Sequence, residues 1–367
     1  MSGERRYRAG AIGRTGRGNF GHGLHLGFLE ADSVDLVAVA DPDEEGRSSV
    51  AEEVGAERTY ADFRQMLAEE DLDLVSIGPR WVDCHEEMVL ACADAGCHIY
   101  CEKPLAASLD SADRMVSAAR AAGVKLAVAH QGVYLPQVVQ VKRLLDGGRI
   151  GPVQSIHAHG KQDRRGGGED MMVLGTHLFN MMRFFAGDVA WMWGHVTSGG
   201  RGVRAEDVRD AREPIGPIAG DCVNSYFAFE SGVSGTFDSR ADQAGGGKAM
   251  ATEIVGREGR ILLRGGAAGQ GVLYPHGLWA PEDDAQAWEP LDLAQAALGD
   301  GNRLAVLDLI DAAETDRDPV SSGRDATSAL EMILGAYESE ITGRRVTFPM
   351  QDRTHPLERL RAGKEAP

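Results

Sequence analysis

The sequence predicts an α/β domain built on a parallel sheet, followed by an α+β domain with a large open, mainly antiparallel sheet. Three observations predict this architecture. Strand-like and helix-like segments alternate over about the first 130 residues, strand-like segments then follow one another, and 367 residues suit two cores better than one. We expect domains at residues 1–130 and 131–367, with the C-terminal helices packing back toward the first domain.

The first domain alternates short apolar runs with helical segments. We expect strands where apolar and β-branched residues lie between turn-forming residues, at 7–12, 34–40, 72–77, 98–101 and 125–129. We expect helices at residues 20–30, 44–54, 83–95 and 111–122. Gly96 and Gly123 close the last two helices, because glycine readily adopts the left-handed conformation of a helix end. This alternation predicts βαβ units and a parallel sheet.

The pattern changes in the second domain. One more helix is expected at residues 138–145. Strand-like segments then follow across short glycine-rich turns, at residues 153–162, 190–198, 222–229, 233–239, 252–255, 260–263 and 272–274. Further helices are expected at residues 173–185, 303–315 and 326–342. Consecutive strands joined by short turns favour an open, mainly antiparallel sheet.

The composition is that of an acidic globular protein. Lys and Arg total 38 and Asp and Glu total 56, which gives a net charge of −18. A surface this acidic repels nucleic-acid phosphates and anionic lipids, so we expect neither nucleic acid nor membrane as a partner. The polar N-terminus leads into a glycine-rich turn rather than into the apolar stretch of a signal peptide, and we expect a cytoplasmic protein.

The five cysteines are odd in number and form no C-x-x-C motif. Four of them lie between residues 84 and 101 together with His85 and His98, so a metal site has to be weighed. Their spacings fit no common zinc pattern, and the stretch is predicted to be a helix followed by a strand. We expect free thiols in a reducing compartment and no bound metal.

The first predicted strand ends in the glycine-rich turn GRTGRGNFG, which begins at Gly13. The usual G-x-G-x-x-G frame falls on Gly13 and Gly18, with Thr15 at its middle position. A second frame, Gly16, Gly18 and Gly21, keeps the spacing. Because the turn follows a strand and opens a helix, it favours a dinucleotide site in a Rossmann domain over a flexible surface turn. The residues expected to bind the cofactor here are Gly13, Arg14, Thr15, Gly16, Arg17 and Gly18.

Asp41 ends the second predicted strand, 20 residues after Gly21. A carboxylate at this point accepts hydrogen bonds from the adenosine ribose hydroxyls and repels a 2′-phosphate, which favours NAD over NADP. Two alternatives stay open. Asp41-Pro42 is also a common turn start, and Arg14 and Arg17 lie near enough to receive a phosphate.

Further motifs occur in order along the chain. Pro79 is followed by His85 six residues later, and Glu102-Lys103-Pro104 stands in the segment AGCHIYCEKPLA. The helical segment VLGTHLFN contains His177, and AYESEITGRRVTFP lies near the C-terminus. Taken together, these motifs resemble the glucose–fructose oxidoreductase/inositol dehydrogenase (Gfo/Idh/MocA) family, and the resemblance covers nearly the whole chain.

The resemblance implies a Rossmann domain, an open-sheet second domain and NAD(P)-linked oxidation or reduction of a sugar or cyclitol. It also implies that Lys103 and His177 are catalytic. Further cofactor contacts implied by the resemblance are Gly78, Pro79, Trp81, His85, Glu102, Lys103 and Gln131.

The chain departs from the family near the histidine. The family has aspartates four residues before and three residues after it, where this chain has Val173 and Asn180. If the helix extends back to Asp170, that residue shares a face with His177 but lies two turns, or about 10 Å, away, so we expect no direct contact between them. Asp163 or Glu169 could orient the histidine instead.

The chemistry supports the same two residues. Oxidation of a secondary alcohol needs a hydride acceptor, a base for the hydroxyl proton and a cation or donor for the developing alkoxide. Lys103 suits the alkoxide, and His177, with an ordinary pKa of about 6.5, suits proton transfer at neutral pH. Without the resemblance, a solvated loop lysine and a hydrogen-bonded core histidine would be the simpler interpretation.

Polar residues gather between residues 157 and 170. His157, His159 and Lys161 alternate as on one strand face, which could line a substrate cleft or face solvent. The loop that begins at Arg164 could form a flexible lid. The residues considered as substrate contacts are Tyr134, His159, Lys161, Asp163, Arg164 and Asn180.

Three functions follow from these observations. The first is a sugar or cyclitol dehydrogenase or reductase, and the second is redox-assisted glycoside cleavage with bound NAD. The third is a cofactor-sensing regulator; Lys103 opposes this third function, and Val173 keeps it open. Because an open sheet needs a cover for its free face, we also expect a homodimer or homotetramer.

Overall fold

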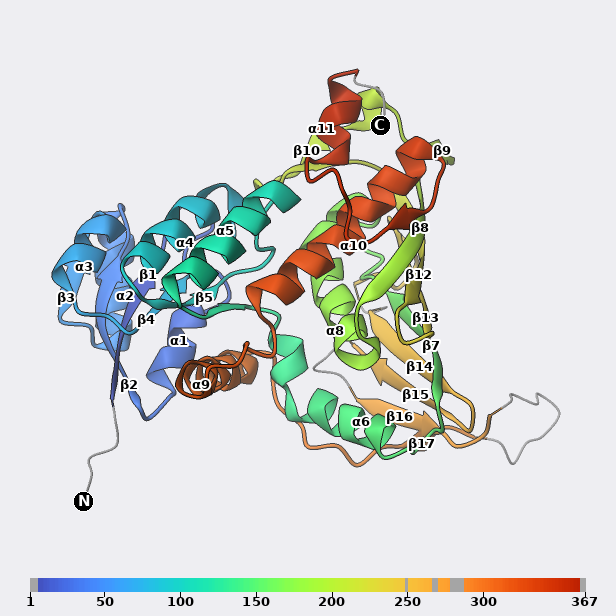
Figure 1. Ribbon diagram of the computed structural model, residues 1–367, viewed down its shortest axis with the longest axis horizontal. Helices are drawn as coiled ribbons and strands as arrows, with labels where there is room; N and C mark the ends of the chain where they lie inside the picture. The colour runs from blue at the N-terminus through green and yellow to red at the C-terminus, as the bar shows by residue number, and fades with distance from the viewer. Residues whose placement is uncertain (1–5, 248–249, 266–269, 278–286, 364–367) are drawn as a thin grey trace. The chain divides into compact units, whose positions relative to one another are not determined.

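The computed structural model describes residues 6–247, 250–265, 270–277 and 287–363 (Figure 1). Residues 1–5 of the polar N-terminus lie outside the described residues. The chain divides into two compact units. Unit 1 comprises Met1–Gln131, Arg212–Gly216 and Gly299–Thr327, and unit 2 comprises Gly132–Ala211, Pro217–Leu298 and Ser328–Pro367. Unlike a continuous boundary at residue 130, this division assigns Gly299–Thr327 to unit 1.

Unit 1 is built on a six-stranded parallel sheet in the order β3-β2-β1-β4-β5-β6. The strands are β1 (Tyr7–Ile12), β2 (Val34–Ala40), β3 (Arg58–Tyr60), β4 (Leu74–Ile77), β5 (His98–Cys101) and β6 (Leu126–Val128). The central strands are apolar along most of their length because helices cover both faces of a parallel sheet. The predicted Rossmann domain is therefore confirmed.

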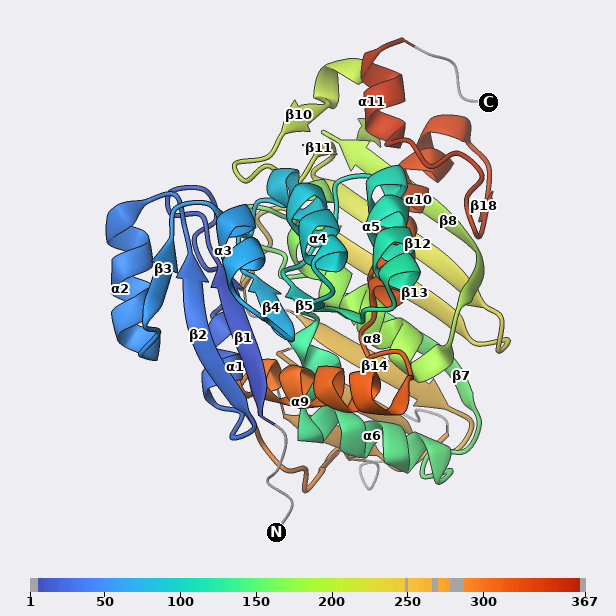
Figure 2. The ribbon, with the colours of Figure 1, turned by 60° about the vertical axis from the view of Figure 1, so that its left-hand side comes forward.

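The helices of unit 1 lie on the two faces of this sheet (Figures 1 and 2). They are α1 (Leu24–Leu29), α2 (Glu44–Val54), α3 (Phe63–Glu69), η1 (Val82–Cys84), α4 (His85–Asp94), α5 (Leu109–Ala122) and α9 (Asp300–Thr315). The helix α9 lies beside α1, although almost the whole chain separates them. Strand order reverses between β1 and β4, and the crevice at the carboxyl ends of these strands is where such folds bind ligands.

One prediction for unit 1 needs correction, and two elements of this unit were not predicted. The first helix was expected over residues 20–30 but begins only at Leu24, because Gly21 and Gly23 adopt left-handed φ values of 60° and 72°. The strand β3 and the helix α3 were not predicted. The strand has three residues, two of them exposed, so it leaves no alternating apolar pattern.

Unit 2 contains a ten-stranded sheet with the path β17-β16-β15-β14-β7-β13-β12-β8-β18, and β9 pairs with β8. Its pairs are antiparallel except for β7 with β13, which confirms the expected mainly antiparallel sheet. The strands are β7 (Val153–His159), β8 (Val189–Ser198), β9 (Arg201–Gly202), β12 (Cys222–Phe229), β13 (Ser234–Arg240), β14 (Ala251–Gly256), β15 (Arg260–Arg264), β16 (Gly271–Tyr274), β17 (Glu289–Pro290) and β18 (Val346–Thr347). A separate pair is formed by β10 (Arg209–Asp210) and β11 (Pro217–Ile218).

The helical segments of unit 2 are η2 (Gln131–Tyr134), α6 (Pro136–Asp146), α7 (Gly168–Asp170), η3 (Met171–Gly175), α8 (Thr176–Ala186), η4 (Ala205–Asp207), α10 (Gly323–Thr342) and α11 (Pro356–Arg361), where η2 and α10 cross the division between units. One face of the sheet packs on α8. Phe179 of α8 meets Phe227 and Phe237 of the sheet edge-on, with ring centroids 5.6 and 4.7 Å apart. The opposite face leaves Trp193 and Tyr226 about half exposed.

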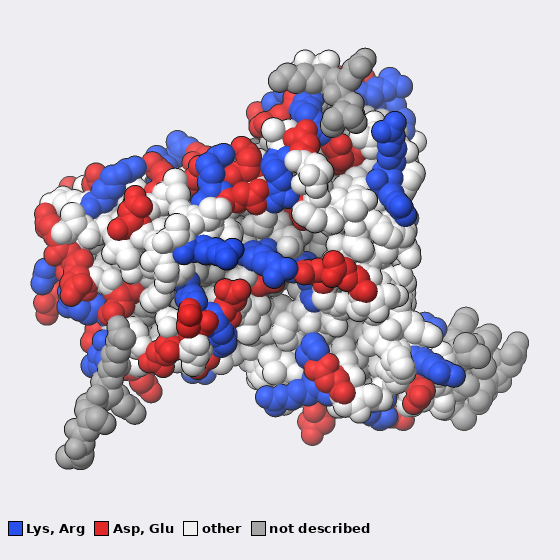
Figure 3. Space-filling view, in the orientation of Figure 1, with Lys and Arg blue, Asp and Glu red and all other residues white. Residues whose placement is uncertain are grey.

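No helix among the described residues is long and apolar enough to cross a membrane. Acidic and basic side chains are interspersed on the face of the protein shown in Figure 3.

Candidate active site

The glycine-rich turn packs its backbone against the carboxyl ends of β4 and β5. Gly18 and Gly21 have φ values of 89° and 60°. A Cβ atom on Gly18 would lie 2.5 Å from the backbone nitrogen of Arg80, and one on Gly21 would lie 2.2 Å from the carbonyl oxygen of Gly78. Gly16 also has a positive φ, of 77°, but a Cβ there would meet nothing within 4 Å. The frame Gly16, Gly18 and Gly21 therefore describes the turn, and two of its glycines are required by close approach.

The first residues of the turn contact one another and β2. Gly13 packs against the ring of Phe20, and Arg14 exchanges backbone hydrogen bonds with Asn19. Asp41, at the end of β2, is buried, and its Oδ2 accepts hydrogen bonds of 2.8 Å from both the backbone N–H and the hydroxyl of Thr15. Its Oδ1 accepts from the backbone of Asp43. Asp41 therefore joins the turn to β2, a contact that sequence analysis did not foresee.

The segment after β4 completes one side of the turn. The guanidinium of Arg17 lies over the ring of Trp81, 5.0 Å from its centroid, and bonds to Asp83 at 2.5 Å. His85 is fully buried, with Nε2 2.6 Å from the carbonyl of Pro79 and Nδ1 3.0 Å from a carbonyl that follows the Glu-Lys-Pro segment. Arg17 and Trp81 are therefore in contact beside the turn, and His85 is held by the carbonyl of Pro79 in the same segment.

The predicted catalytic lysine follows β5 and is tied to the turn. Lys103 is only 6% exposed, and its backbone N–H donates to Oε2 of Glu102 at 2.9 Å. The other carboxylate oxygen of Glu102 accepts from the backbone N–H of His22 at 2.8 Å and lies 2.5 Å from the His22 ring. Burial disfavours the charge of Glu102, but the hydrogen bonds and charge of His22 outweigh burial and hold the pKa of this carboxyl below its usual range.

Gln131 lies where β6 gives way to η2 and is buried. Its amide oxygen has no hydrogen-bond partner among the described residues. A buried polar atom without a partner is costly, and so it indicates a position where a ligand or water completes the bonding. The neighbouring His130 lies 3.1 Å from the hydroxyl of Ser321 and is held by the protein itself.

His177 and Asn180 lie in unit 2, on α8. His177 is partly exposed and Asn180 is buried. The π-helical segment η3 lies between Asp170 and His177. A shared face of Asp170 and His177 would need a regular α-helix that extends back to Asp170, whereas a wider π turn lies between them and changes this register. Such π segments occur frequently at functional sites.

The carboxylates offered as substitutes for the family's aspartates are engaged elsewhere. Oδ2 of Asp170 accepts from the backbone of Lys161 and the hydroxyl of Ser239, and burial raises the pKa of this carboxyl. Oδ1 of Asp170 has no hydrogen-bond partner in the part of the chain described. The carboxylate of Asp163 is paired with Arg165, and the carboxylate of Glu169 is paired with Arg209.

The remaining substrate candidates are separated within unit 2. His159 is half exposed, bonds Asp238 and lies on the sheet face opposite Ala158, whose strand partner Phe237 packs on α8. Arg164, where a lid was considered, is exposed, and the glycines that follow it closely approach other backbone. A Cβ on Gly166 would lie 2.1 Å from the backbone of residue 240. Tyr134 is buried in η2.

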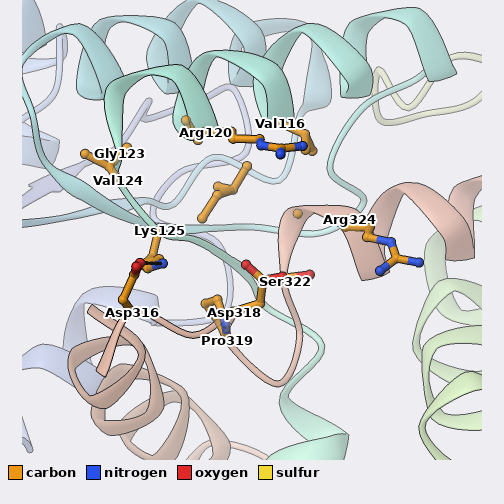
Figure 4. Close-up of a pocket in the computed structure, with 13 residues that line it drawn as sticks. Val116, Arg120, Gly123, Val124, Lys125, Asp316, Asp318, Pro319, Ser322 and Arg324 are labelled. Carbon is orange, nitrogen blue, oxygen red and sulfur yellow. Dashed lines mark hydrogen bonds and ion pairs between the residues drawn. The ribbon is translucent and has the colours of Figure 1, made fainter. Parts of the chain in front are cut away.

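A separate cavity of about 670 Å³ lies at the amino end of β6, opposite the edge that holds the turn (Figure 4). Lys125 and Asp316 are paired there at 2.7 Å, and Arg120 and Arg324 line it as well. None of the predicted site residues lines it.

No group of three or more His, Cys, Asp or Glu in the described chain is arranged to hold a metal ion. Burial raises the pKa of both the Cys84 and the Cys97 thiol to about 11, so both stay protonated at neutral pH.

Sequence analysis missed three residues around the turn: His22, Tyr100 and Asn302. His22 directly follows the quoted glycine-rich segment, so its bond to Glu102 could have been considered. Asn302 lies 280 residues away and donates to the carbonyl of His22 at 3.0 Å. Its amide oxygen accepts from Tyr100 at 2.9 Å. No local pattern signals such a contact, because it depends on how α9 packs.

The turn geometry predicts that the same glycine-to-alanine substitution has different effects on stability at positions 16 and 21. Gly16→Ala adds only left-handed backbone strain, whereas Gly21→Ala also drives a methyl group into the Gly78 carbonyl and the Glu102 carboxylate. We expect a loss in the free energy of unfolding of about 1–2 kcal/mol for Gly16→Ala and about 2–5 kcal/mol for Gly21→Ala. Denaturant unfolding of both variants measures this, and equal losses would show that the turn does not pack as described.

Comparison with known proteins agrees with this geometry. Residues 11–130 match the model of the oxidoreductase family with an NAD-binding Rossmann fold, and residues 138–262 match the GFO/IDH/MocA C-terminal domain. D-apiose dehydrogenase of Paraburkholderia graminis is 28% identical over 346 residues, which cover 88% of this chain and 85% of that protein. Myo-inositol 2-dehydrogenase of Thermotoga maritima is 26% identical, over 68% of this chain and 74% of that protein.

The fold is similar to that of a solved oxidoreductase from Agrobacterium radiobacter in complex with NAD+, L-tartaric acid and magnesium. The TM-score is 0.74 at 20% identity, over 93% of this chain and 98% of that one. Both family models fall on this chain in their expected order, with the first on the Rossmann unit and the second on the open-sheet unit. The chain belongs to the Gfo/Idh/MocA family of oxidoreductases.

Proposed function

We propose that this chain is an NAD-dependent oxidoreductase that transfers a hydride between nicotinamide and a secondary alcohol or ketone of a sugar, sugar derivative or cyclitol. The observation that carries the proposal is the position of Lys103. It is a buried lysine whose backbone is linked through Glu102 to the glycine-rich turn of a Rossmann domain. A cation held beside a dinucleotide site is suited to a substrate oxygen that becomes negative during the reaction.

The residues of unit 1 fit a dinucleotide. Gly18 and Gly21 let the turn pack closely against the segments that follow β4 and β5, at the carboxyl ends of the central strands, where such folds bind ligands. The buried amide oxygen of Gln131 offers an acceptor that no described residue uses. Asp41 adds a buried carboxylate at the end of β2, which supports NAD over NADP through repulsion of a 2′-phosphate.

Residues of this chain supply the positive charge that stabilises the substrate oxygen and the base that accepts its proton. Bound NAD supplies the hydride acceptor. The Lys103 ammonium stabilises the oxygen of the alcohol as its proton leaves, and the buried Glu102 holds the lysine's backbone in place. His177 takes the proton as the general base, a role for which its imidazole suits neutral pH.

The substrate class rests on the relatives. One of them is a D-apiose dehydrogenase and another a myo-inositol 2-dehydrogenase, so both act on polyhydroxylated carbon skeletons. We extend only this shared substrate class, a polyhydroxylated carbon skeleton, to the present chain. Asn180, buried on the same helix as His177, and Lys161 are the polar residues of unit 2 that we propose to test first as substrate contacts.

We also propose that the outer sheet face of unit 2 forms the interface of a homodimer or homotetramer. Trp193 and Tyr226 are direct cross-strand partners there and are 47% and 40% exposed. Large aromatic side chains on an open sheet are costly to leave in water. Light scattering measures the mass in solution, and a monomer at micromolar concentration would refute this interface.

The five free cysteines support a cytoplasmic location.

Removal of the lysine charge tests the mechanism. We expect Lys103→Met to bind NAD almost as tightly as the wild type but to turn over at least a hundredfold more slowly, because the developing alkoxide loses its cation. Lys125→Met is the matched control. Lys125 is also mostly buried, but it pairs with Asp316 at the opposite edge of the sheet. Steady-state NADH absorbance measures both, and undiminished turnover in Lys103→Met would remove this residue from the mechanism.

Cofactor preference should depend on the charge of Asp41. We expect the wild type to bind NAD more tightly than NADP, and Asp41→Ser to narrow the ratio of the two dissociation constants. Because Asp41 also holds Thr15, both affinities should fall, and the ratio is the informative quantity. Asp41→Asn keeps an acceptor for Thr15 without the charge and should narrow the ratio as well. Calorimetric titration with both cofactors measures this, and a wild type that prefers NADP would contradict it.

The rate–pH profile tests the proposed base. Val173 and Asn180 stand where the family has carboxylates. The base must be neutral to accept the proton, so the rate should rise with pH as neutral imidazole replaces imidazolium, which gives an ascending limb. We expect His177→Ala to lower turnover strongly and to lose that limb, while NAD binding stays near the wild-type value. A retained limb would assign the base to another group.

A further inference from the structure

A buried side chain links the backbone that directly follows the glycine-rich turn, at His22 and Gly23, to the strand that precedes Lys103. Asn302 stands in the first turn of α9 and is 3% exposed. Its amide nitrogen donates to the carbonyl oxygens of His22 and Gly23, at 3.0 and 3.3 Å. Its amide oxygen accepts from the hydroxyl of Tyr100 at 2.9 Å. Both polar groups of the Asn302 amide are therefore used, since the nitrogen donates to backbone carbonyls and the oxygen accepts from Tyr100.

Tyr100 extends this link to the catalytic segment. It lies in β5, is fully buried, and stands two residues before Glu102 and three before Lys103. Glu102 forms a second link, since its carboxylate binds the backbone and ring of His22. Two independent connections therefore run between the same turn and the same strand, one through a carboxylate and one through a neutral amide.

The two connections differ physically. The Glu102 link involves a carboxylate and the His22 ring, whose side chain is 40% exposed. The Asn302 link joins a buried amide and a buried phenol hydroxyl, so it contains no ion pair for salt to screen. The two carbonyls fix which way the amide faces, because a carbonyl oxygen only accepts and therefore requires the amide nitrogen. The amide oxygen is then left to accept from the Tyr100 hydroxyl.

Packing leaves Asn302 little freedom. The helices α1 and α9 lie side by side (Figure 2). A Cβ atom on Gly27 of α1 would come within 2.7 Å of the Asn302 backbone, so the two helices touch there through bare glycine. The close packing of the two helices therefore fixes the position of the Asn302 side chain relative to the end of the turn.

We propose that Asn302 and Tyr100 are positioning residues that fix the glycine-rich turn relative to Lys103, and thereby set how tightly NAD binds and how well it is aligned. This inference rests on the proposed function. Neither residue contacts the reacting atoms in this proposal. They act through the turn backbone and through β5, and their loss should loosen the turn without disturbing the rest of the sheet.

Three substitutions separate the parts of the link. Asn302→Ala removes all of its hydrogen bonds, and Asn302→Asp keeps the acceptor for Tyr100 but loses the donors to the carbonyls. Tyr100→Phe keeps the ring and removes only the hydroxyl. We expect the dissociation constant of NAD to rise about tenfold or more in both Asn302 variants and about fivefold in Tyr100→Phe, in line with the loss of several or one neutral hydrogen bonds.

Tyr7→Phe is the matched control. The Tyr7 hydroxyl is also mostly buried and also binds α9, but it does so at Glu314, near the far end of the helix. We expect this variant to lose thermal stability while it keeps the wild-type dissociation constant for NAD. Hydrogen exchange in the absence of cofactor provides a second readout, and amides of residues 18–23 should exchange faster in Tyr100→Phe and not in Tyr7→Phe.

The outcomes are distinguishable. Unchanged NAD affinity and unchanged exchange of the turn in folded Tyr100→Phe and Asn302→Asp would overturn the positioning role. Equal losses of affinity in Tyr100→Phe and Tyr7→Phe would also overturn it, because they would indicate general destabilisation. A wild type with no measurable NAD binding would instead contradict the proposed function, while the exchange measurement would still test the link between Asn302 and the turn.

Discussion

The close approach of one backbone to another, which only glycine permits, is the constraint on which the candidate site depends. Gly18 and Gly21 sit against the segment after β4 and against Glu102, at distances that leave no space for a methyl group. This contact lets a buried carboxylate reach the turn from one side and a buried amide from the other. The same contact also fixes the position of Lys103, because the backbone N–H of Lys103 donates to the carboxylate of Glu102.

Much of unit 1 could be predicted because its signals are local. The strand β2 is a run of apolar residues bounded by turn formers, and α2 begins at a side-chain cap on Asp43 and ends at Gly55. The turn and the Glu-Lys-Pro segment could be recognised as motifs, and the structure brings the two into contact at Gly21 and Glu102. The short β3 could not be predicted, since its three residues carry no periodic pattern.

The contacts that complete the site could not be predicted, because they join distant parts of the chain. Asn302 meets the turn only after α9 packs on α1, and Asp41 binds Thr15 only because the turn folds back over the end of β2. The π segment before His177 is a third case, since the spacing to Asp170 assumed a regular α-helix. In each case tertiary packing decides a contact that local propensity leaves open.

Hydride transfer itself is the most direct measurement of the proposed function. The enzyme would be incubated with NAD and a panel of sugars and cyclitols that carry deuterium at each secondary alcohol carbon. We expect deuterium to appear at the nicotinamide ring with at least one of these compounds, together with net NADH and the corresponding ketone. Tight NAD binding without transfer of label from any of them would contradict an oxidoreductase of this substrate class. Label transfer with cleavage of a glycoside and no net NADH would assign the chemistry to redox-assisted cleavage instead.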